Sequence, residues 1–198
     1  MTDINDETLI DRAQKGDKAA FDEFYQRHKK QIFTYIYRFV GNRELAEELT
    51  QETFINAYTH LDKYLAKGKP LAWIYTIASN LSKNALKSRA VRKEVSLNTP
   101  LKNSNGQLDL LDVLEDFKEK TQLTIMNEEL ASKIQESIDS LPIEDKEILL
   151  LCDMQGQSYQ DVAQILGCKT STVGSRLFRA RKKIAKKLAV IYKEKPRK

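Results

Sequence analysis

The sequence contains few of the residues that make turns, cross-links or metal sites. Its 198 residues include seven glycines and four prolines, and apolar and polar residues nowhere alternate over the length of a strand, which excludes a turn-rich β protein. The two cysteines, Cys152 and Cys168, and the two histidines, His28 and His60, do not stand at the spacing of a disulfide framework or a metal site. We therefore expect buried, unpaired cysteines, ordinary histidines, and no metal or cofactor.

Long apolar runs are also missing. No stretch approaches the roughly 20 apolar residues that a membrane-spanning helix needs, and the N-terminal residues lack the pattern of a signal peptide. Hydrophobic residues make up 41% of the chain, which is enough for buried cores, and their spacing is helical. These features predict an all-α protein that is soluble and cytoplasmic, with no membrane insertion.

Acidic residues are scarce at the C-terminal end. Residues 169–198 contain twelve lysines and arginines and one glutamate, a net charge of +11, whereas the first 168 residues carry a net charge of −6. A charge asymmetry of this size indicates a polyanionic partner at the C-terminal end and a different partner elsewhere.

Capping and helix-breaking residues divide the chain into two small helical domains joined by a flexible linker. We expect the first domain over residues 1–93, with helices over residues 6–15, 17–40, 43–61 and 70–92. Residues 94–124 have a polar, turn-forming composition typical of a linker. Periodicity returns at residue 125, so the second domain covers residues 125–198.

The second domain contains the pattern of a helix-turn-helix. Ser158 and Asp161 form a capping-box signature, Gly167 ends a short helix, and Thr170 or Ser171 is expected to cap the next one. Five apolar residues share one side of that second helix: Val173, Leu177, Ala180, Ile184 and Leu188. The opposite side carries Ser171, Ser175, Phe178, Arg179, Lys182 and Lys186. An apolar side that packs on the protein and an opposite side that carries positive charge are typical of a helix that enters a DNA groove.

A second basic surface lies in the first domain. Residues 63–93 contain eight lysines and arginines and no acidic residue, and they include the only tryptophan of the chain, Trp73. On the helix that begins at Pro70, Trp73 shares the polar side with Thr76, Asn80, Lys83 and Lys87. One interpretation is that the indole folds back over the core. The other is that it forms a stacking platform for unpaired bases beside cations, with Asn80 bonding a base edge.

Three stretches, "AEELTQETFINAY" (46–58), "AWIYTIASNLSKN" (72–84) and "LPIEDKEILLLCDMQGQSYQDVAQILGCKTSTVGSRLFRAR" (141–181), together resemble a bacterial sigma factor of the extracytoplasmic-function (ECF) group in the sigma-70 family. The resemblance implies a first domain of the region 2 type, which binds core RNA polymerase and melts the minus-ten element. It implies a second domain of the region 4 type, which reads the minus-thirty-five element.

The resemblance also implies the contact residues. The single strand of the minus-ten element would contact Trp73, Thr76, Asn80, Lys83 and Lys87, and the loop of residues 64–70 would hold an extruded base. The minus-thirty-five duplex would contact Ser171, Thr172, Ser175, Arg176, Phe178, Arg179 and Lys182. Core RNA polymerase, through its β′ clamp helices and β subunit, would contact Glu47, Glu48, Gln51, Glu52 and Phe54. Whether an anti-sigma factor is a further partner stays open.

Three questions remain open at this stage. The acidic stretch 108–119, with Asp109, Asp112, Glu115 and Asp116, is either a solvated tether or a segment that threads the nucleic-acid channel of the polymerase. Relatives usually carry Lys or Arg at the position of Gly174. Either the backbone approaches the DNA closely there, or recognition has shifted to Phe178 and Arg179 and the glycine is a tolerated loss.

The third open question is the class of function. The alternative to a sigma factor is an operator-binding helix-turn-helix regulator that acts without polymerase. An enzyme is not expected, since no paired carboxylates beside a basic cleft, metal-ligand cluster or nucleophile–base pair is found in the sequence.

Overall fold

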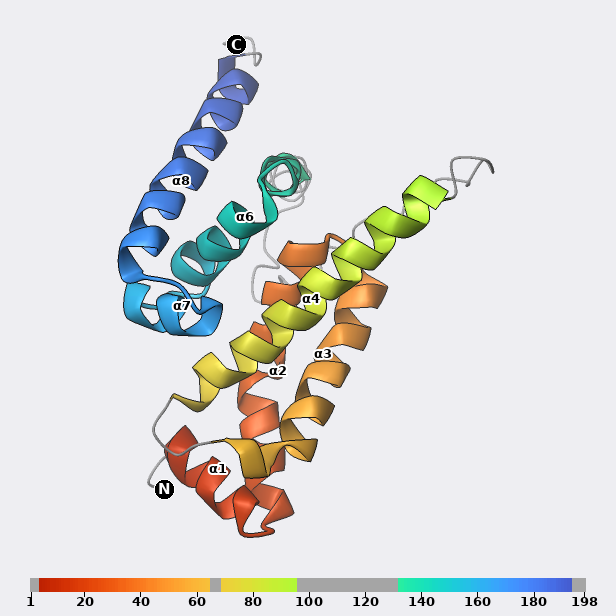
Figure 1. The fold of residues 1–198 in the computed structure, drawn as a ribbon, viewed down its shortest axis with the longest axis vertical. Coiled ribbons are helices and arrows are strands. Elements are labelled where there is room, and N and C mark those ends of the chain that lie inside the picture. The colour runs from red at the N-terminus through yellow and green to blue at the C-terminus, as the bar shows by residue number, and fades with distance from the viewer. Residues whose placement is uncertain (1–3, 65–68, 96–131, 194–198) are drawn as a thin grey trace, which may run out of the picture.

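The computed structural model describes residues 4–64, 69–95 and 132–193. Within these ranges the chain forms helices and no strand, so the predicted all-α class is confirmed. The first unit contains α1 (Asp6–Gln14), α2 (Lys18–Val40), α3 (Arg43–Thr59), the short 3-10 turn η1 (Leu61–Lys63) and α4 (Pro70–Val95). The second contains a helix over residues 132–139, α6 (Ile143–Leu149), the π turn η4 (Leu150–Met154), α7 (Tyr159–Leu166) and α8 (Thr170–Lys193) (Figure 1).

The helices of the first unit begin where the sequence supplies a capping side chain. Asn5, Asp17 and Asn42 each accept a hydrogen bond from the backbone N–H three residues ahead, and the Asn42 Oδ1 to Leu45 N distance is 2.8 Å. Such a bond satisfies one of the backbone donors that a helix leaves unpaired at its first turn. The predicted starts of α1, α2 and α3 are therefore confirmed.

The core of the first unit lies between α2, α3 and α4. Helix α2 contributes the fully buried Phe24, Ile36 and Phe39, and α4 contributes Ile74 and Ala78. Helix α1 lies across one end of this group, while α4 is the long helix that runs diagonally over α2 and α3 (Figure 1). The helical spacing of these residues explains why all of them meet at one interface.

The core of the second unit lies under α8. Val173, Leu177 and Ala180 are fully buried against α6 and α7, whereas Ile184 and Leu188 are half-buried. The apolar stripe predicted for this helix is thus buried in its first three turns and more open beyond them. Gly167 adopts the left-handed conformation, with φ of 61°, at the end of α7, which gives the short turn its direction.

Two expectations about this unit are corrected. Helix α8 begins at Thr170, so neither Thr170 nor Ser171 is its cap, and the carbonyl of Lys169 accepts the first hydrogen bonds instead. Cys152 and Cys168 are unpaired as expected, but both are half-buried because each lies at the edge of the core. The acidic stretch 108–119 falls outside the described residues.

Replacement of the α3 cap tests the account of this fold. We expect Asn42→Ala to lower the free energy of unfolding by about 1 kcal/mol, because the Leu45 N–H loses its acceptor. Asn42→Asp, which retains a side-chain oxygen at the same position, is the control and should unfold close to the parent. Urea denaturation followed by circular dichroism measures both, and equal losses in the two variants would contradict the capping role.

Candidate nucleic-acid interface

Trp73 lies on the polar side of α4, next to the ring of Tyr64. Trp73 is half-buried, and its indole packs against the ring of Tyr64, with ring centroids 5.0 Å apart and an angle of 41° between the planes. Asn80 and Lys87 are exposed further along the helix, and the Thr76 hydroxyl donates to the Ala72 carbonyl at 3.0 Å. Trp73 is therefore packed against the core and still partly accessible, and its role as a stacking platform remains a prediction.

Two lysines on this side of the molecule are already paired with carboxylates of the second unit. The Lys83 Nζ lies 3.2 Å from the Glu147 Oε1, and the Lys69 Nζ lies 2.8 Å from the Asp161 Oδ2. Burial alone would raise the pKa of Asp161, but hydrogen bonds from Lys69 and Ser158 outweigh it and hold this pKa below its usual range. Asp161 is therefore a carboxylate near neutral pH.

The predicted capping box is confirmed, and its acidic residue also makes contacts outside α7. Ser158 caps α7 as expected, by accepting from the Asp161 N–H at 3.2 Å. The Asp161 carboxylate, however, accepts from the Ser158 hydroxyl at 2.7 Å and from Lys69, so it faces α4 as well as its own helix. Contacts between the two units were not predicted, because the sequence gives no pattern that relates residues about 90 positions apart.

Most side chains on the predicted DNA-reading side of α8 are exposed to solvent. Phe178 is 69% exposed, and Ser171, Ser175, Arg179 and Lys182 are also exposed, while Thr172 and Arg176 are half-buried. Among the described residues, Phe178 is the most exposed of the large hydrophobic side chains. This surface therefore presents apolar, hydrogen-bonding and cationic groups together, which is the chemistry that reads a DNA groove.

Carboxylates of the same unit pair with three cations of α8. Asp145, which is nearly buried, receives the Lys183 Nζ at 3.1 Å and the Arg179 Nη2 at 3.6 Å. Arg181 makes two hydrogen bonds to Asp153, of 3.0 and 2.6 Å. These pairs hold α8 against α6 and η4. Arg179, one of the predicted DNA-reading residues, is among the paired cations, although its side chain is 60% exposed.

Gly174 lies on α8 beside α7. A Cβ added there would stand 3.7 Å from the Tyr159 Cε2, which is an ordinary van der Waals distance. In the part of the chain that the structure describes, no atom therefore excludes a Cβ at this position, and the backbone is helical. Gly174 leaves this point of the junction between the two helices of the helix-turn-helix without a side chain.

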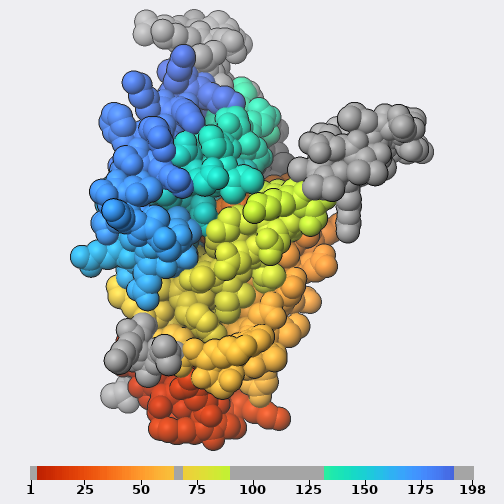
Figure 2. Space-filling view, in the orientation of Figure 1, coloured from red at the N-terminus to blue at the C-terminus, as the bar shows by residue number. Residues whose placement is uncertain are grey.

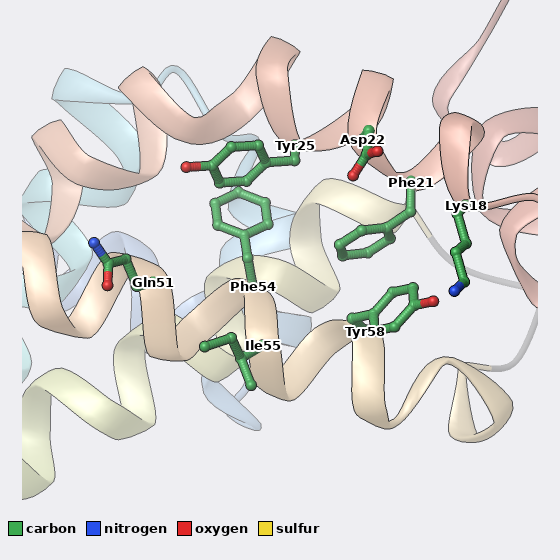
Figure 3. A pocket seen from close by; sticks show the side chains of 8 residues that line it. All are labelled: Lys18, Phe21, Asp22, Tyr25, Gln51, Phe54, Ile55 and Tyr58. Atoms are coloured by element: carbon green, nitrogen blue, oxygen red, sulfur yellow. The ribbon is translucent and has the colours of Figure 1, made fainter.

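A third surface lies on α3, away from both basic ones. Glu47, Glu48, Gln51 and Glu52 are exposed along it, and Phe54 is buried behind them. A groove between α2 and α3 continues this surface (Figure 3). It is lined by Lys18, Phe21, Asp22, Tyr25, Gln51, Phe54, Ile55 and Tyr58.

The groove has aromatic walls that the sequence reasoning missed. The Tyr25 and Phe54 rings meet edge to face with centroids 4.9 Å apart, and the Phe21 and Tyr58 rings are 5.0 Å apart. Ile55 is 63% exposed at its rim. An isoleucine one turn after Gln51, on the polar side of α3, is the sequence signal that could have indicated an apolar contact there.

Neither a metal site nor a membrane helix is found among the described residues. No group of three or more histidine, cysteine, aspartate or glutamate side chains in those ranges is arranged to hold a metal ion. No helix in the same ranges is long and apolar enough to cross a membrane. His28 pairs with Asp6 at 2.7 Å, and the His60 ring bonds the Asn56 carbonyl at 2.9 Å.

Known proteins resemble this chain over both units. Residues 24–92 match the family model described as sigma-70 region 2, and residues 131–184 match the one described as sigma-70, region 4. The RNA polymerase sigma-H factor of Pseudomonas aeruginosa is 33% identical over 194 residues, which cover 98% of this chain and 99% of that relative. The chain belongs to the sigma-70 family.

The relatives of this sigma-70 family member include the ECF group. The ECF RNA polymerase sigma-E factor of Escherichia coli K12 is 31% identical over 185 residues, which cover 93% of this chain and 95% of that protein. Two solved structures share the fold. CnrH, in complex with the cytosolic domain of CnrY, has a TM-score of 0.68 at 20% identity and covers 96% of this chain and 99% of its own. The sigma factor RpoE of Bartonella quintana, in complex with the anti-sigma factor NepR, has a TM-score of 0.65 at 22% identity and covers 86% and 97%.

The helical conformation of Gly174 generates a prediction. Gly174→Ala should raise the free energy of unfolding by about 0.5–1 kcal/mol, because alanine is the better helix former and its Cβ fits. Gly167→Ala is the contrast within the same helix-turn-helix, and its left-handed backbone should make that change destabilising. Thermal or urea denaturation compares the two, and a destabilised Gly174→Ala variant would contradict the account.

Proposed function

We propose that the protein is a sigma factor that binds core RNA polymerase, directs it to specific promoters and helps to melt their DNA. The observation that carries this proposal is the presence of both sigma-70 regions, in order, in a chain that matches a sigma factor over 98% of its length. A conventional operator-binding regulator needs the helix-turn-helix but has no use for a second basic surface or for the acidic surface on α3.

The α4 surface is proposed to receive the non-template strand of the minus-ten element. Trp73 offers a ring on which a base can stack, and stacking of this kind is worth about 1–3 kcal/mol per base. Asn80 can bond a base edge, while Thr76, Lys83 and Lys87 lie along the same side for the backbone. Extrusion of a base costs a few kcal/mol, which these contacts together can offset.

The open side of α8 is proposed to read the minus-thirty-five duplex. Ser171, Thr172 and Ser175 stand in its first two turns, where a recognition helix contacts base edges. Arg176, Phe178, Arg179 and Lys182 follow and can contact phosphates or a thymine methyl group. The net charge of +11 over residues 169–198 favours association with any DNA and makes it sensitive to salt.

The α3 surface is proposed to bind polymerase at the β′ clamp helices, with further contact to the β subunit. Glu47, Glu48, Gln51 and Glu52 present an acidic edge, and the aromatic groove beside them adds apolar area for a partner helix. A charged rim around an apolar centre is the usual arrangement of a protein interface. Exposed Ile55 and the ring of Tyr58 extend the contact set inferred from the sequence.

In this proposal the protein contributes recognition, and the polymerase contributes the chemistry. We expect no enzymatic activity from the chain alone, and we expect it to act in the cytoplasm together with the polymerase. An anti-sigma factor is a proposed additional partner.

Transcription with purified components tests the function. Core RNA polymerase plus this protein should give run-off transcripts from a defined subset of genomic DNA fragments, and core polymerase alone should not. If the protein instead binds one operator at nanomolar concentration by itself and never stimulates the core enzyme, it is an operator-binding regulator.

Substitutions on α4 should separate melting from polymerase binding. Trp73→Ala and Asn80→Ala should each reduce permanganate reactivity of thymines in the minus-ten region by at least several-fold, because the extruded strand loses stacking or a hydrogen bond. Lys30→Ala, an exposed change on α2, is the control. Normal reactivity in both α4 variants, with polymerase bound, would assign Trp73 to the core alone.

Charge reversal on α3 should have the opposite effect. Glu48→Lys combined with Glu52→Lys should abolish co-purification with core polymerase, since both side chains are exposed and their loss leaves the core of α3 intact. Glu7→Lys combined with Asp62→Lys reverses the same number of exposed charges elsewhere in the first unit and should bind normally. Retained binding by the α3 variant would remove this surface from the polymerase interface.

A further inference from the structure

Gln14, the last residue of α1, holds the turn that follows α3. Its side-chain Nε2 donates to the carbonyl oxygens of Leu61 and Tyr64, at 2.7 and 2.9 Å. These carbonyls belong to the first residue of η1 and to the residue that ends it, and the two bonds use both hydrogens of the amide group. Figure 2 shows the N-terminal residues, in red, directly beside the yellow-orange residues at the end of α3 and in η1. One side chain of α1 therefore clamps a distant backbone turn.

The end of α1 fixes the backbone from which this side chain leaves. The Gly16 N–H donates to the Ala13 carbonyl at 3.0 Å and the Asp17 N–H donates to the Arg12 carbonyl at 3.1 Å, which is a Schellman ending. The Asp17 carboxylate accepts two further hydrogen bonds from Arg12, at 2.9 and 2.6 Å, and these hold its pKa below its usual range. The last turn of α1 is thus tied to the start of α2, and Gln14 lies within it.

Tyr64 connects the clamped turn to the tryptophan. Its side chain is buried, and its ring lies 5.0 Å from the Trp73 ring between centroids. Burial raises the pKa of Tyr64, and the charge of Glu7 raises it further, so the phenol lies within electrostatic reach of α1. Glu7 and Gln14 are seven residues apart and share one side of that helix. Helix α1 therefore supports Tyr64 at its backbone and along its ring.

The position of Trp73 depends on this support. Trp73 lies in the first turn of α4 and is half-buried. Because Tyr64 is buried and Trp73 is only half-buried, their contact lies on the inner side of the indole and leaves the outer side accessible. Ordering a side chain upon binding costs free energy, so a ring that is already held in place binds a base more tightly.

We infer that Gln14 is a positioning residue for the proposed strand surface: it holds Tyr64, and Tyr64 holds the indole of Trp73 ready for stacking. The inference rests on the proposed function, because only there is Trp73 a strand contact. Gln14 acts through Tyr64 and does not itself touch the strand. Helix α1, which supplies none of the proposed DNA or polymerase contacts, thereby contributes to strand binding.

Fluorescence of Trp73, the only tryptophan of the chain, tests the positioning without DNA. Gln14→Met keeps the length and helix propensity of this exposed side chain but cannot donate a hydrogen bond. We expect acrylamide to quench this variant about twofold more strongly than the parent, because the lost bonds free Tyr64 and the indole. Thr8→Met, the same replacement at an exposed, neutral residue of α1, is the control and should be quenched like the parent.

A restored donor separates positioning from a folding defect. Gln14→Lys supplies an ammonium group that can donate to both carbonyls, and it should return quenching to the level of the parent. Circular dichroism should show the same helix content in all of these variants. If Gln14→Met is quenched like the parent, or if Gln14→Lys is quenched as strongly as Gln14→Met, the clamp does not hold the indole and the inference is wrong.

Binding of a fluorescently labelled pool of random single-stranded DNA tests the consequence for the strand. Gln14→Met should bind it about three- to tenfold more weakly than Thr8→Met, the range expected for lost hydrogen bonds. Added to Trp73→Ala, Gln14→Met should cause no further loss, since it acts only through the indole. Additive losses, or normal binding by Gln14→Met, would overturn the positioning role. Normal binding by Trp73→Ala would instead overturn the proposed strand site, and the quenching experiment, done without DNA, keeps the two failures apart.

Discussion

Burial of α4 on two sides is the constraint on which the rest of the structure depends. Ile74 and Ala78 pack into the core with α2 and α3, while Ser79 is covered by the second unit. The Tyr75 ring belongs to both environments, because it packs edge to face on Tyr35 at 5.2 Å and its hydroxyl reaches Gln155. The exposed part of α4 carries Asn80 and Lys87, which are among the proposed strand contacts.

The distribution of charge follows from the same arrangement. Carboxylates that face inward, Asp145 and Glu147, each meet cations of α8 or α4, whereas the carboxylates of α3 face solvent. The buried carboxylates fix how the helices pack, because separating one of them from its cation would leave an unpaired charge in the interior. Exposed charges such as those of Glu48 and Glu52 contribute little to stability, so the binding role proposed for them costs the fold little.

Much of this fold could be predicted because its signals are local. Caps such as Asn42, the break at Gly167 and the stripe from Val173 to Ala180 depend on neighbouring residues and on helical periodicity alone. Some candidate contact residues, such as Phe178 and Glu48, are exposed as expected, whereas Lys83, predicted on the open side of α4, is paired with the buried Glu147. Their roles as DNA or polymerase contacts remain predictions.

The contacts between the two units could not be predicted from the sequence. Glu147 is a charged residue in an amphipathic helix, and nothing within α6 indicates that Ser79 and Lys83 cover it. Its burial depends on a packing angle set by several helices together. The groove beside Phe54 escaped prediction for a similar reason, because Tyr25 and Tyr58 come from different helices and meet only in three dimensions.

The central claim is that the exposed side of α4 receives a single DNA strand, and the only tryptophan of the chain provides a direct probe of it. Titration of the free protein with single-stranded DNA should quench the fluorescence of Trp73 in a saturable manner, because a base stacks on the indole. A duplex of equal length should quench it far less. Unchanged fluorescence at DNA concentrations that saturate binding, as measured by anisotropy of a labelled strand, would contradict the account.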